Sequence, residues 1–171
     1  MTTRSNKLIM RPLKLEDARH IMGWVNDPVV TKNLQHFSKR FTLKDEKAYV
    51  KRMIASRSDF VFSFFDKKTG EYVGQGGIHQ IIRENKLGRL AVVVKKDFWG
   101  KGYAQYIIPS LVRFAFDKLK LHKVWIMVYS DNKKSLHINS KLGFKKERLL
   151  REEYFWRGKY HDMVRMAIIK K

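Results

Sequence analysis

Residues 95–104 read Lys-Lys-Asp-Phe-Trp-Gly-Lys-Gly-Tyr-Ala, and this stretch decides the fold that we expect for the chain. It follows the unbroken apolar run from Leu90 to Val94 and precedes a long segment with apolar residues at helical spacing. The pattern predicts a strand, a glycine turn and the first turn of a helix. The first N–H groups of a helix lack intrahelical acceptors and carry the positive end of its dipole. Because Gly100 and Gly102 have no Cβ to keep an anion away from these groups, the turn is suited to holding phosphate.

A plainer interpretation of the same stretch is a glycine-containing connection between a strand and a helix. In that case Lys95, Lys96 and Lys101 are solvated surface residues and add no charge to an anion site. A lone Gly-x-Gly does not separate the two interpretations, so the sequence context has to decide.

That context includes a second block downstream, Asn132-Lys133-Lys134-Ser135 followed by Lys141-Leu142-Gly143-Phe144. It resembles the N-x-x-S … K-L-G-F signature of the GNAT N-acetyltransferase branch that contains ribosomal-protein alanine acetyltransferases and bacterial spermidine acetyltransferases. The stretch from Trp99 to Ala104 resembles the acyl-coenzyme A pyrophosphate loop of the same superfamily, Q/R-x-x-G-x-G/A. The resemblance runs from about Leu8 to Ile169 and is specific from about Leu90 to Phe144.

One residue and one short segment bear further on this resemblance. Asp97 stands where the loop normally has Gln or Arg, and we interpret the acidic residue as a trait of this branch. The segment from Trp24 to Pro28 resembles, over a short match, one in amino-sugar nucleotide acetyltransferases.

The fold class that the resemblance implies is α+β, the GNAT-like acyl-CoA acyltransferase fold. Its central sheet is mostly antiparallel, with splayed fourth and fifth strands and helices on both faces. We expect residues 1–171 to form a single GNAT domain, because no repeat or linker interrupts the chain. Hydrophobic periodicity and turn residues predict helices over residues 15–26, 42–55, 102–119 and 133–142, and strands over residues 8–13, 60–65, 72–82, 89–95, 122–129, 144–155 and 160–169. Pro109 predicts a kink or a late start in the third of these helices.

Composition indicates a folded protein that lies in the cytoplasm. The 171 residues are 44% apolar and include 11 Phe and 4 Trp, enough for a full core. The absence of Cys excludes disulfides, thiolate metal sites and cysteine nucleophiles, and the six His have no paired metal-ligand spacing, so we expect no metal. No signal peptide or membrane span is predicted, because the apolar runs are too short.

The charge balance is strongly basic. There are 37 Lys and Arg against 16 Asp and Glu, which gives a net charge of +21. Such a field attracts polyanions, among them nucleic acid and nucleotide-bearing ligands. The basic residues are spread along the chain instead of forming one tail, so a lysine-rich background explains them equally well.

The resemblance implies acetyl-CoA as cosubstrate. In this fold the pantetheine arm lies between the splayed strands and pairs with exposed backbone groups, and one of these amides polarises the thioester carbonyl. A run of three valines is, however, also typical of a plain buried strand. The implied cofactor-binding residues are Val92, Val93, Val94, Trp99, Gly100, Lys101, Gly102, Tyr103, Ala104 and Asn132.

The implied catalytic residues are Ser135 and His79. Asn139 stands where many relatives carry the Tyr that protonates the departing thiolate, which leaves the Ser135 hydroxyl as the acid. Its alternatives are a role at a helix start or in hydrogen bonding to the cofactor. Arg89 stands where many relatives carry a Glu base. His79 could then act as base through a water, although a structural histidine and an ordered water are both alternatives.

For the acceptor site, the segment between the first two helices provides Trp24, Asn26, His36 and Phe37, with packing as the alternative for each. The implied function is transfer of acetyl to a primary amine, either a peptide N-terminus such as that of a ribosomal protein or a small amine. The net charge argues against a polyamine, because a multiply charged cation needs several carboxylates. The alternative function is an RNA- or ribosome-associated binding module with little turnover. We expect no membrane partner and a monomer or homodimer.

Overall fold

A single sheet organises the chain. A computed structural model describes residues 3–4, 7–35 and 39–171, and in these residues eight strands follow the order β1-β2-β3-β4-β5-β6-β8-β7. All neighbouring strands are antiparallel except β5 and β6, which are parallel. The strands are β1 Thr3–Arg4, β2 Leu8–Pro12, β3 Phe60–Asp66, β4 Tyr72–Ile82, β5 Leu87–Val94, β6 Lys123–Tyr129, β7 Lys145–Trp156 and β8 Lys159–Ile169.

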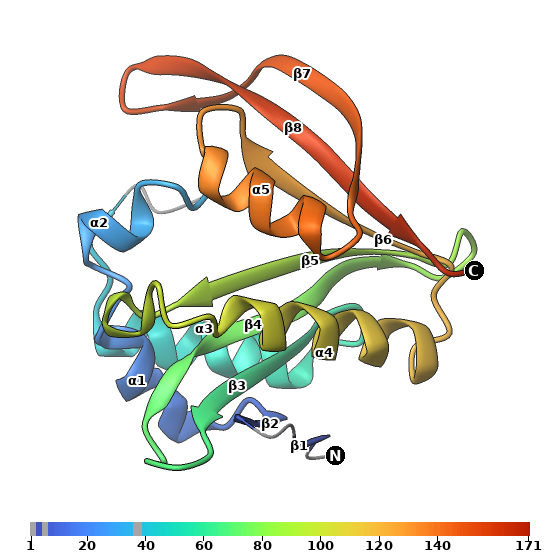
Figure 1. The fold of residues 1–171 in the computed structure, drawn as a ribbon. Helices are drawn as coiled ribbons and strands as arrows, with labels where there is room; N and C mark the ends of the chain where they lie inside the picture. Colours follow the sequence, from blue (N-terminus) through green and yellow to red (C-terminus); the bar gives the residue numbers. More distant parts are fainter. Residues whose placement is uncertain (1–2, 5–6, 36–38) are drawn as a thin grey trace.

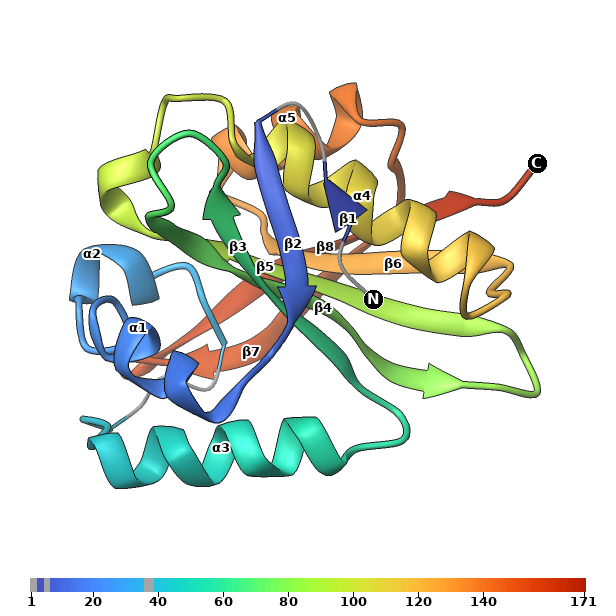
Figure 2. The same cartoon turned by 90° about the horizontal axis from the view of Figure 1, so that it is seen from below.

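Helices cover both faces of this sheet, as Figure 2 shows for α3 on one side and α4 on the other. Alternation along β3 explains the two layers, because Val61 packs with α1 and α3 while Phe62 and Phe64 pack with α4. The helices are η1 Leu15–Asp17, α1 Ala18–Met22, α2 Pro28–Thr31, α3 Leu43–Ala55, η2 Lys96–Phe98, α4 Ala104–Asp117 and α5 Lys133–Lys141.

The two parallel strands separate after a short common stretch (Figure 1). Only Leu87–Arg89 of β5 pair with Lys123–Trp125 of β6. From there β6 continues along β8, with which it pairs over its full length from Lys123 to Tyr129. The splayed pair that the sequence led us to expect is thereby confirmed, and it is β5 and β6 in the present numbering.

Most predicted elements form close to their predicted bounds. Thr42 accepts a hydrogen bond from the Asp45 N–H and Asp45 accepts one from the Thr42 N–H, so α3 begins with a capping box, at the predicted start of that helix. Gly143 ends the α5 region with a φ of +95°. The β7–β8 turn has positive φ at Arg157 and Gly158, as a two-residue hairpin turn requires.

Two details differ from the expectation, and the position of β8 in the sheet was not predicted. The first predicted helix is shorter, and Asp27 caps a further helix, α2, that has Pro28 in its first turn. The short helix η2 precedes the glycine turn, so α4 begins at Ala104 and continues through Pro109. Strand β8 lies between β6 and β7, which leaves β7 at the edge of the sheet and mostly exposed.

A buried carboxylate ties the N-terminal elements to the sheet. The side chain of Asp17 is fully buried and accepts hydrogen bonds from both terminal nitrogens of Arg11, at 2.8 and 2.6 Å. It also accepts from the Ser63 hydroxyl and from the Lys14 N–H, each at 2.8 Å. Burial by itself would raise the pKa of Asp17, but these hydrogen bonds outweigh burial and lower it.

Replacing this carboxylate should destabilise the fold. Asp17→Ala leaves Ser63 and the Arg11 guanidinium without their shared acceptor, so we expect a loss of about 3 kcal/mol in the free energy of unfolding, measured by urea denaturation. Because folding lowers the pKa of Asp17, its contribution is present above the ordinary carboxyl value of 3.8 and disappears as the pH falls below it. The variant should therefore lose less stability than the parent protein on acidification. Glu16→Ala is the control, because its side chain is 68% exposed. Equal stability of the two variants would contradict the role given to Asp17.

Candidate active site

The glycine turn between η2 and α4 presents free backbone donors. Gly100 and Gly102 have φ values of +74° and +78°, which other residues rarely adopt. Among the described residues, no backbone acceptor receives a hydrogen bond from the N–H groups of residues 100–105. Space beside Gly100 is open, since a Cβ there would have no heavy atom within 4 Å. The turn therefore has the geometry expected of an anion-binding helix start.

Side-chain hydrogen bonds fix this turn at both ends. Trp99 donates its indole N–H to the carbonyl of Val94 at 2.7 Å, which ties the turn to the end of β5. Tyr103 donates its hydroxyl to Asp66 at 2.6 Å, which ties the start of α4 to the end of β3. That hydrogen bond raises the pKa of Tyr103 to about 12 and lowers the pKa of Asp66.

A cation from the N-terminal segment also reaches the turn. The Lys7 ammonium donates to the carbonyl of Lys101 at 2.7 Å and lies 4.4 Å from the centre of the Tyr103 ring. Residues 7 and 101 are too far apart in sequence for any local pattern to predict this contact. Lys7 was therefore not predicted as a charge beside the candidate phosphate site.

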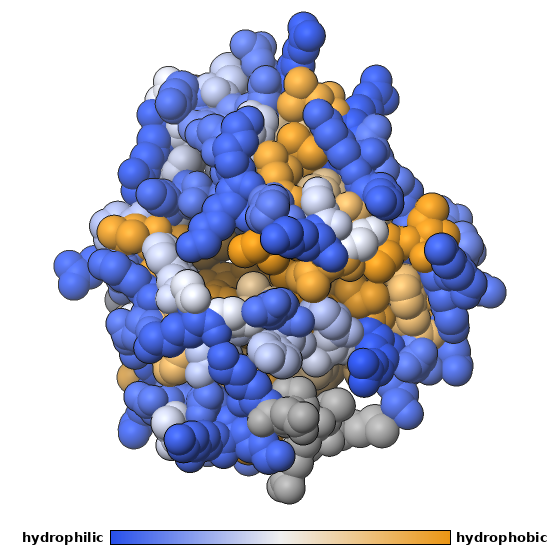
Figure 3. Space-filling view, in the orientation of Figure 1, coloured by the Kyte–Doolittle hydropathy of each residue, from blue (hydrophilic) through white to orange (hydrophobic). Residues whose placement is uncertain are grey.

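The edge of β5 from Leu90 to Val94 leads through η2 to the glycine turn. One side of this edge pairs with β4, and the other has no strand partner among the described residues because β6 has turned away. Val92 and Val94 are partly buried against the core below α4, together with Leu136 of α5. Figure 3 shows apolar side chains in the recess at the centre of this face, where the molecule is hollowed. Val92, Val93 and Val94 thus lie on an open strand edge that ends at the glycine turn.

Asn132 and Ser135 meet at the start of α5. Asn132 is the helix cap and accepts the Ser135 N–H at 3.1 Å, so the capping role falls to Asn132 and not to Ser135. The Ser135 hydroxyl accepts from the side-chain amide of Asn139 at 3.2 Å, and the same amide donates to the Ser135 carbonyl at 2.8 Å. The hydroxyl oxygen is therefore oriented as an acceptor and its own proton remains available to another group. The sequence had indicated only that Asn139 cannot serve as an acid, and its contact with Ser135 was not predicted.

A second hollow adjoins the same helix start. It has a volume of about 490 Å³ and lies where the end of α2 approaches the start of α5. Asn132 is one of its lining residues, and the others are Lys32, Asn33, Asp131, Lys133 and Lys134. Three cations against one carboxylate make this hollow suitable for an anionic part of a ligand.

His79 lies on β4 opposite Arg89 of β5, with its Nδ1 3.0 Å from a carboxylate oxygen of Asp59. Burial lowers the pKa of His79 and the Arg89 charge lowers it further, whereas Asp59 opposes both. The imidazole is therefore neutral at pH 7, as a base must be. The contact with Asp59 also fits a purely structural histidine, so the geometry allows both interpretations.

A cavity of about 240 Å³ lies at the point where β5 and β6 part. Leu90 faces the core below α4, so its neighbour Arg89 faces the opposite side of the sheet, where this cavity opens. The cavity draws on four strands and on the segment before α3, and it is lined by Gln35, Arg89, Trp125, Met127, Leu150, Glu153, Tyr154 and Arg165. Of these residues, only Arg89 was singled out from the sequence, as a departure from the family pattern. The alternation along β6 could have indicated that Trp125 and Met127 share one face.

The two predicted acceptor residues that the structure describes, Trp24 and Asn26, do not line this cavity. Trp24 is buried in the core under α1 and α3, and it does not line the cavity. Asn26 exchanges two hydrogen bonds of 2.8 Å with the backbone of Phe41, which holds the segment between the helices in place. His36 and Phe37 lie outside the described residues. Their neighbour Gln35 does line the cavity, so the predicted segment reaches it through a different residue.

Residues 3–4, 7–35 and 39–171 contain no group of three or more His, Cys, Asp or Glu side chains that could hold a metal ion. No helix formed by these residues has the length and apolar character needed to cross a bilayer.

Comparison with known proteins gives consistent matches along the chain. A family model described as an acetyltransferase (GNAT) domain matches residues 7–145. The uncharacterised N-acetyltransferase p20 of Bacillus licheniformis is 27% identical over 172 residues, which cover 99% of this chain and 97% of the relative. The spermidine N(1)-acetyltransferase of Escherichia coli K12 is 27% identical over 161 residues, which cover 94% and 85% of the two chains.

Solved structures agree on the fold. The crystal structure of spermidine N-acetyltransferase from Vibrio cholerae in complex with CoA and spermine matches with a TM-score of 0.89 at 24% identity, covering 96% of each chain. A family match over most of the chain, a fold with parting parallel strands and a glycine turn with free donors lead to one conclusion. This chain belongs to the GNAT family and is an acetyl-CoA-dependent N-acetyltransferase.

Proposed function

We propose that the protein transfers the acetyl group of acetyl-CoA to a primary amine by direct attack in a ternary complex. The observation that carries this proposal is the open edge of β5, which runs from the cavity beside Arg89 to the free N–H groups after Gly100. A thioester bound along that edge would be accessible to an amine that enters through the cavity. Holding both reactants in this way replaces a bimolecular encounter by an oriented one.

The cofactor would be bound mainly by backbone groups. We assign the pyrophosphate to the N–H groups of residues 100–105, with Lys7 and Lys101 as neighbouring cations. The backbone groups of residues 92–94 that face away from β4 would pair with the pantetheine arm, apart from the Val94 carbonyl, which accepts the Trp99 indole N–H, and one amide would stabilise the thioester oxygen. Asn132 and the basic hollow beside it would contact a further part of the same molecule.

Proton transfers would involve two side chains. The Ser135 hydroxyl, whose oxygen is held by the Asn139 amide, would donate its proton to the departing thiolate. His79 would accept the proton of the attacking amine through a water, with Asp59 holding the imidazole. An amine with a modest pKa would need only the ordered water.

The acceptor classes to compare are polyamines, peptide N-termini and amino-sugar nucleotides. Relatives named spermidine N(1)-acetyltransferases favour polyamines. A relative named as a putative ribosomal N-acetyltransferase of Bacillus subtilis, 28% identical over 102 residues, favours a peptide N-terminus. The two guanidiniums in the cavity oppose a multiply charged cation, since they would repel it.

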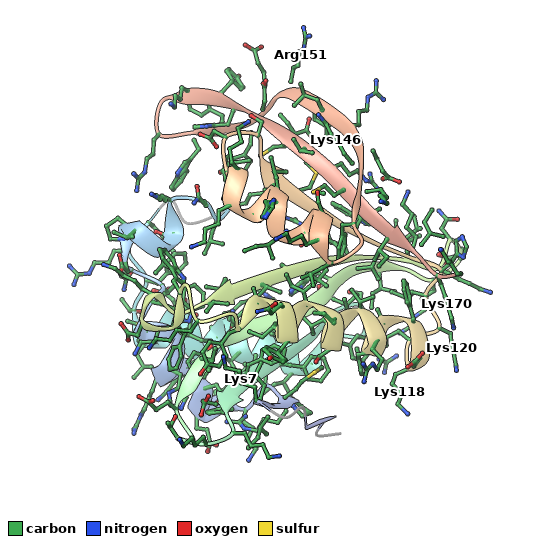
Figure 4. The ribbon with its side chains drawn as sticks, viewed as in Figure 1. Lys7, Lys118, Lys120, Lys146, Arg151 and Lys170 are labelled. Carbon is green, nitrogen blue, oxygen red and sulfur yellow. The ribbon has the colours of Figure 1, made fainter. Side chains whose placement is uncertain are left out.

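Association with RNA or the ribosome remains the alternative use of this chain. The charge of +21 favours it, but the basic residues lie on separate parts of the surface. Figure 4 shows Lys146 and Arg151 on the β7–β8 hairpin, far from Lys118 and Lys120 at the end of α4. A steep fall in RNA affinity with salt would support this alternative.

A cytoplasmic location and a monomeric or homodimeric state also remain predictions.

Release of free thiol from acetyl-CoA tests the proposed function. We expect amine-dependent thiol release with at least one member of a panel of peptides, polyamines and amino sugars, and a mass increase of one acetyl group on that acceptor. Absence of thiol release with every amine, together with no calorimetric binding of acetyl-CoA to the folded protein at millimolar concentration, would overturn the proposal.

The glycine turn can be tested by a matched pair of substitutions. In Gly102→Val a side chain would block the approach of pyrophosphate to the backbone, so the KM for acetyl-CoA should rise by about 10-fold or more. Gly158→Val is the control, because Gly158 has the same φ of +78° and lies in the β7–β8 turn. Both variants carry a similar backbone strain, and only the first should affect acetyl-CoA. An unchanged KM in Gly102→Val would mean that the turn does not hold the cofactor.

The hydroxyl of Ser135 can be tested against that of Ser140, which is exposed on the same helix. Ser135→Ala should lower kcat by about 100-fold with little change in acetyl-CoA affinity, because a general acid acts in the transition state. Ser140→Ala should keep the parental kcat. Full activity of Ser135→Ala would mean that the Ser135 hydroxyl does not donate the proton and that the residue serves only in packing.

A further inference from the structure

We propose that the acceptor carries an oxyanion, a carboxylate or a phosphate, on the same small molecule as its amine, and that Arg89 and Arg165 bind this oxyanion. The proposal rests on the proposed function and names the substrate class of the same site. It follows from the position of the two guanidiniums, the lack of a carboxylate partner for one of them, and the size of the cavity.

The two arginines flank one indole ring. Arg89, Trp125 and Arg165 come from three neighbouring strands, β5, β6 and β8, and all three line the cavity at the fork. The Cζ atoms of Arg89 and Arg165 lie 5.6 and 4.5 Å from the centre of the Trp125 ring. Stacking against the ring restricts both side chains, so their N–H groups are held for a ligand in advance.

Arg89 has no counter-ion among the residues that the structure describes. Its one hydrogen-bond partner among the described residues is the neutral side chain of Gln35, and its Nε is buried without an acceptor. No carboxylate of the described chain lies within ion-pairing distance of it, and the remaining residues, 1–2, 5–6 and 36–38, include no Asp or Glu. Burial lowers the pKa of Arg89, yet a guanidinium stays charged at any physiological pH. A half-buried charge without a partner is costly, and a bound oxyanion would remove that cost.

The lining of the cavity has a net positive charge even when the nearby carboxylates are counted. Glu147 lies 3.4 Å from Arg165 but is shared with Lys123, to which it is also ion-paired. Glu153 is the single carboxylate among the lining residues, against two guanidiniums. It is suited to the ammonium form of the amine, while the arginines are suited to an oxyanion. Ammonium and oxyanion on one molecule match this distribution, whereas a polyamine offers only positive charge.

The dimensions of the cavity favour a small acceptor. A volume of about 240 Å³ is at or below the lower end of ordinary ligand pockets, so it suits a molecule the size of an amino acid or an amino phosphate. Trp125, Met127 and Leu150 supply apolar walls for its carbon chain.

Acceptor pairs that differ only in the anion test this inference. The protein is assayed with acetyl-CoA and two kinds of acceptor pair. In the first, amino carboxylates of increasing chain length are compared with the corresponding carboxamides; in the second, O-phosphoethanolamine is compared with ethanolamine. Spermidine is included as the polyamine. We expect the kcat/KM of at least one oxyanion-bearing acceptor to exceed that of its neutral counterpart by about 10-fold or more, since losing one charge-assisted hydrogen bond to the substrate has an effect of this size. The pair that responds distinguishes carboxylate from phosphate. The amine of an amino amide is less basic and more often neutral, so intrinsic reactivity opposes the expected result.

Variants then identify the residues that produce the preference. Arg89→Gln and Arg165→Gln should each remove most of the preference by raising the KM for the oxyanion-bearing acceptor, with little change for its neutral counterpart. Arg89→Lys should restore part of it, because the charge remains while the planar fork is lost. Arg113→Gln, an exposed arginine on α4, is the control and should keep the parental preference. Circular dichroism and the KM for acetyl-CoA show that each variant is folded.

The outcomes separate this inference from the function on which it rests. Equal use of charged and neutral acceptors, or spermidine exceeding every oxyanion-bearing acceptor, would overturn the inference and leave the acetyltransferase activity intact. A preference that persists in both arginine variants would also overturn it. Failure of every amine to release thiol would instead overturn the proposed function.

Discussion

The structure depends on the limited pairing between β5 and β6. The backbone groups on both edges of a strand are hydrogen-bonded only if a neighbouring strand pairs with each edge. Strand β6 pairs with β5 over just three residues and pairs with β8 over its full length. The free edge of β5 that results is a cost in an ordinary sheet, because unpaired N–H and carbonyl groups are left at the surface of the core. In an N-acetyltransferase the same edge is the natural place for a ligand with amide groups of its own. The fold thus reserves hydrogen-bonding capacity for its cosubstrate.

Around this edge the chain places rigid supports. The glycine turn is held to β5 by the Trp99 indole and to β3 by the Tyr103 hydroxyl, so the helix start cannot swing away from the strand that leads into it. At the start of α5, Asn132 caps the helix and Asn139 fixes the Ser135 oxygen. These supports are neutral or paired, so the positive potential of the turn comes from its free backbone donors and from the neighbouring cations Lys7 and Lys101.

Charge acts at two scales in this protein. The balance of +21 is a long-range property that attracts anions and is screened by salt. The cavity beside Arg89 is a short-range site, where two guanidiniums, one indole and one carboxylate leave little freedom in what can be bound. Substrate choice belongs to the second scale, because buried partners discriminate far more strongly than a diffuse field.

The sequence by itself determined the order of the elements, several of their ends and the family. Local rules suffice for these: the Thr42 capping box, the Gly143 cap and the glycine turn are each readable from a few neighbouring residues. Only the tertiary structure decided which distant groups meet. Lys7 beside the glycine turn, Asp66 under Tyr103, and Gln35 and Arg165 around the cavity have no local signal, because each contact joins segments that the sheet brings together. Strand β8 lies between β6 and β7, and its pairing with β6 directs β6 away from β5 and opens the site. This position likewise depends on strand pairing across the whole sheet.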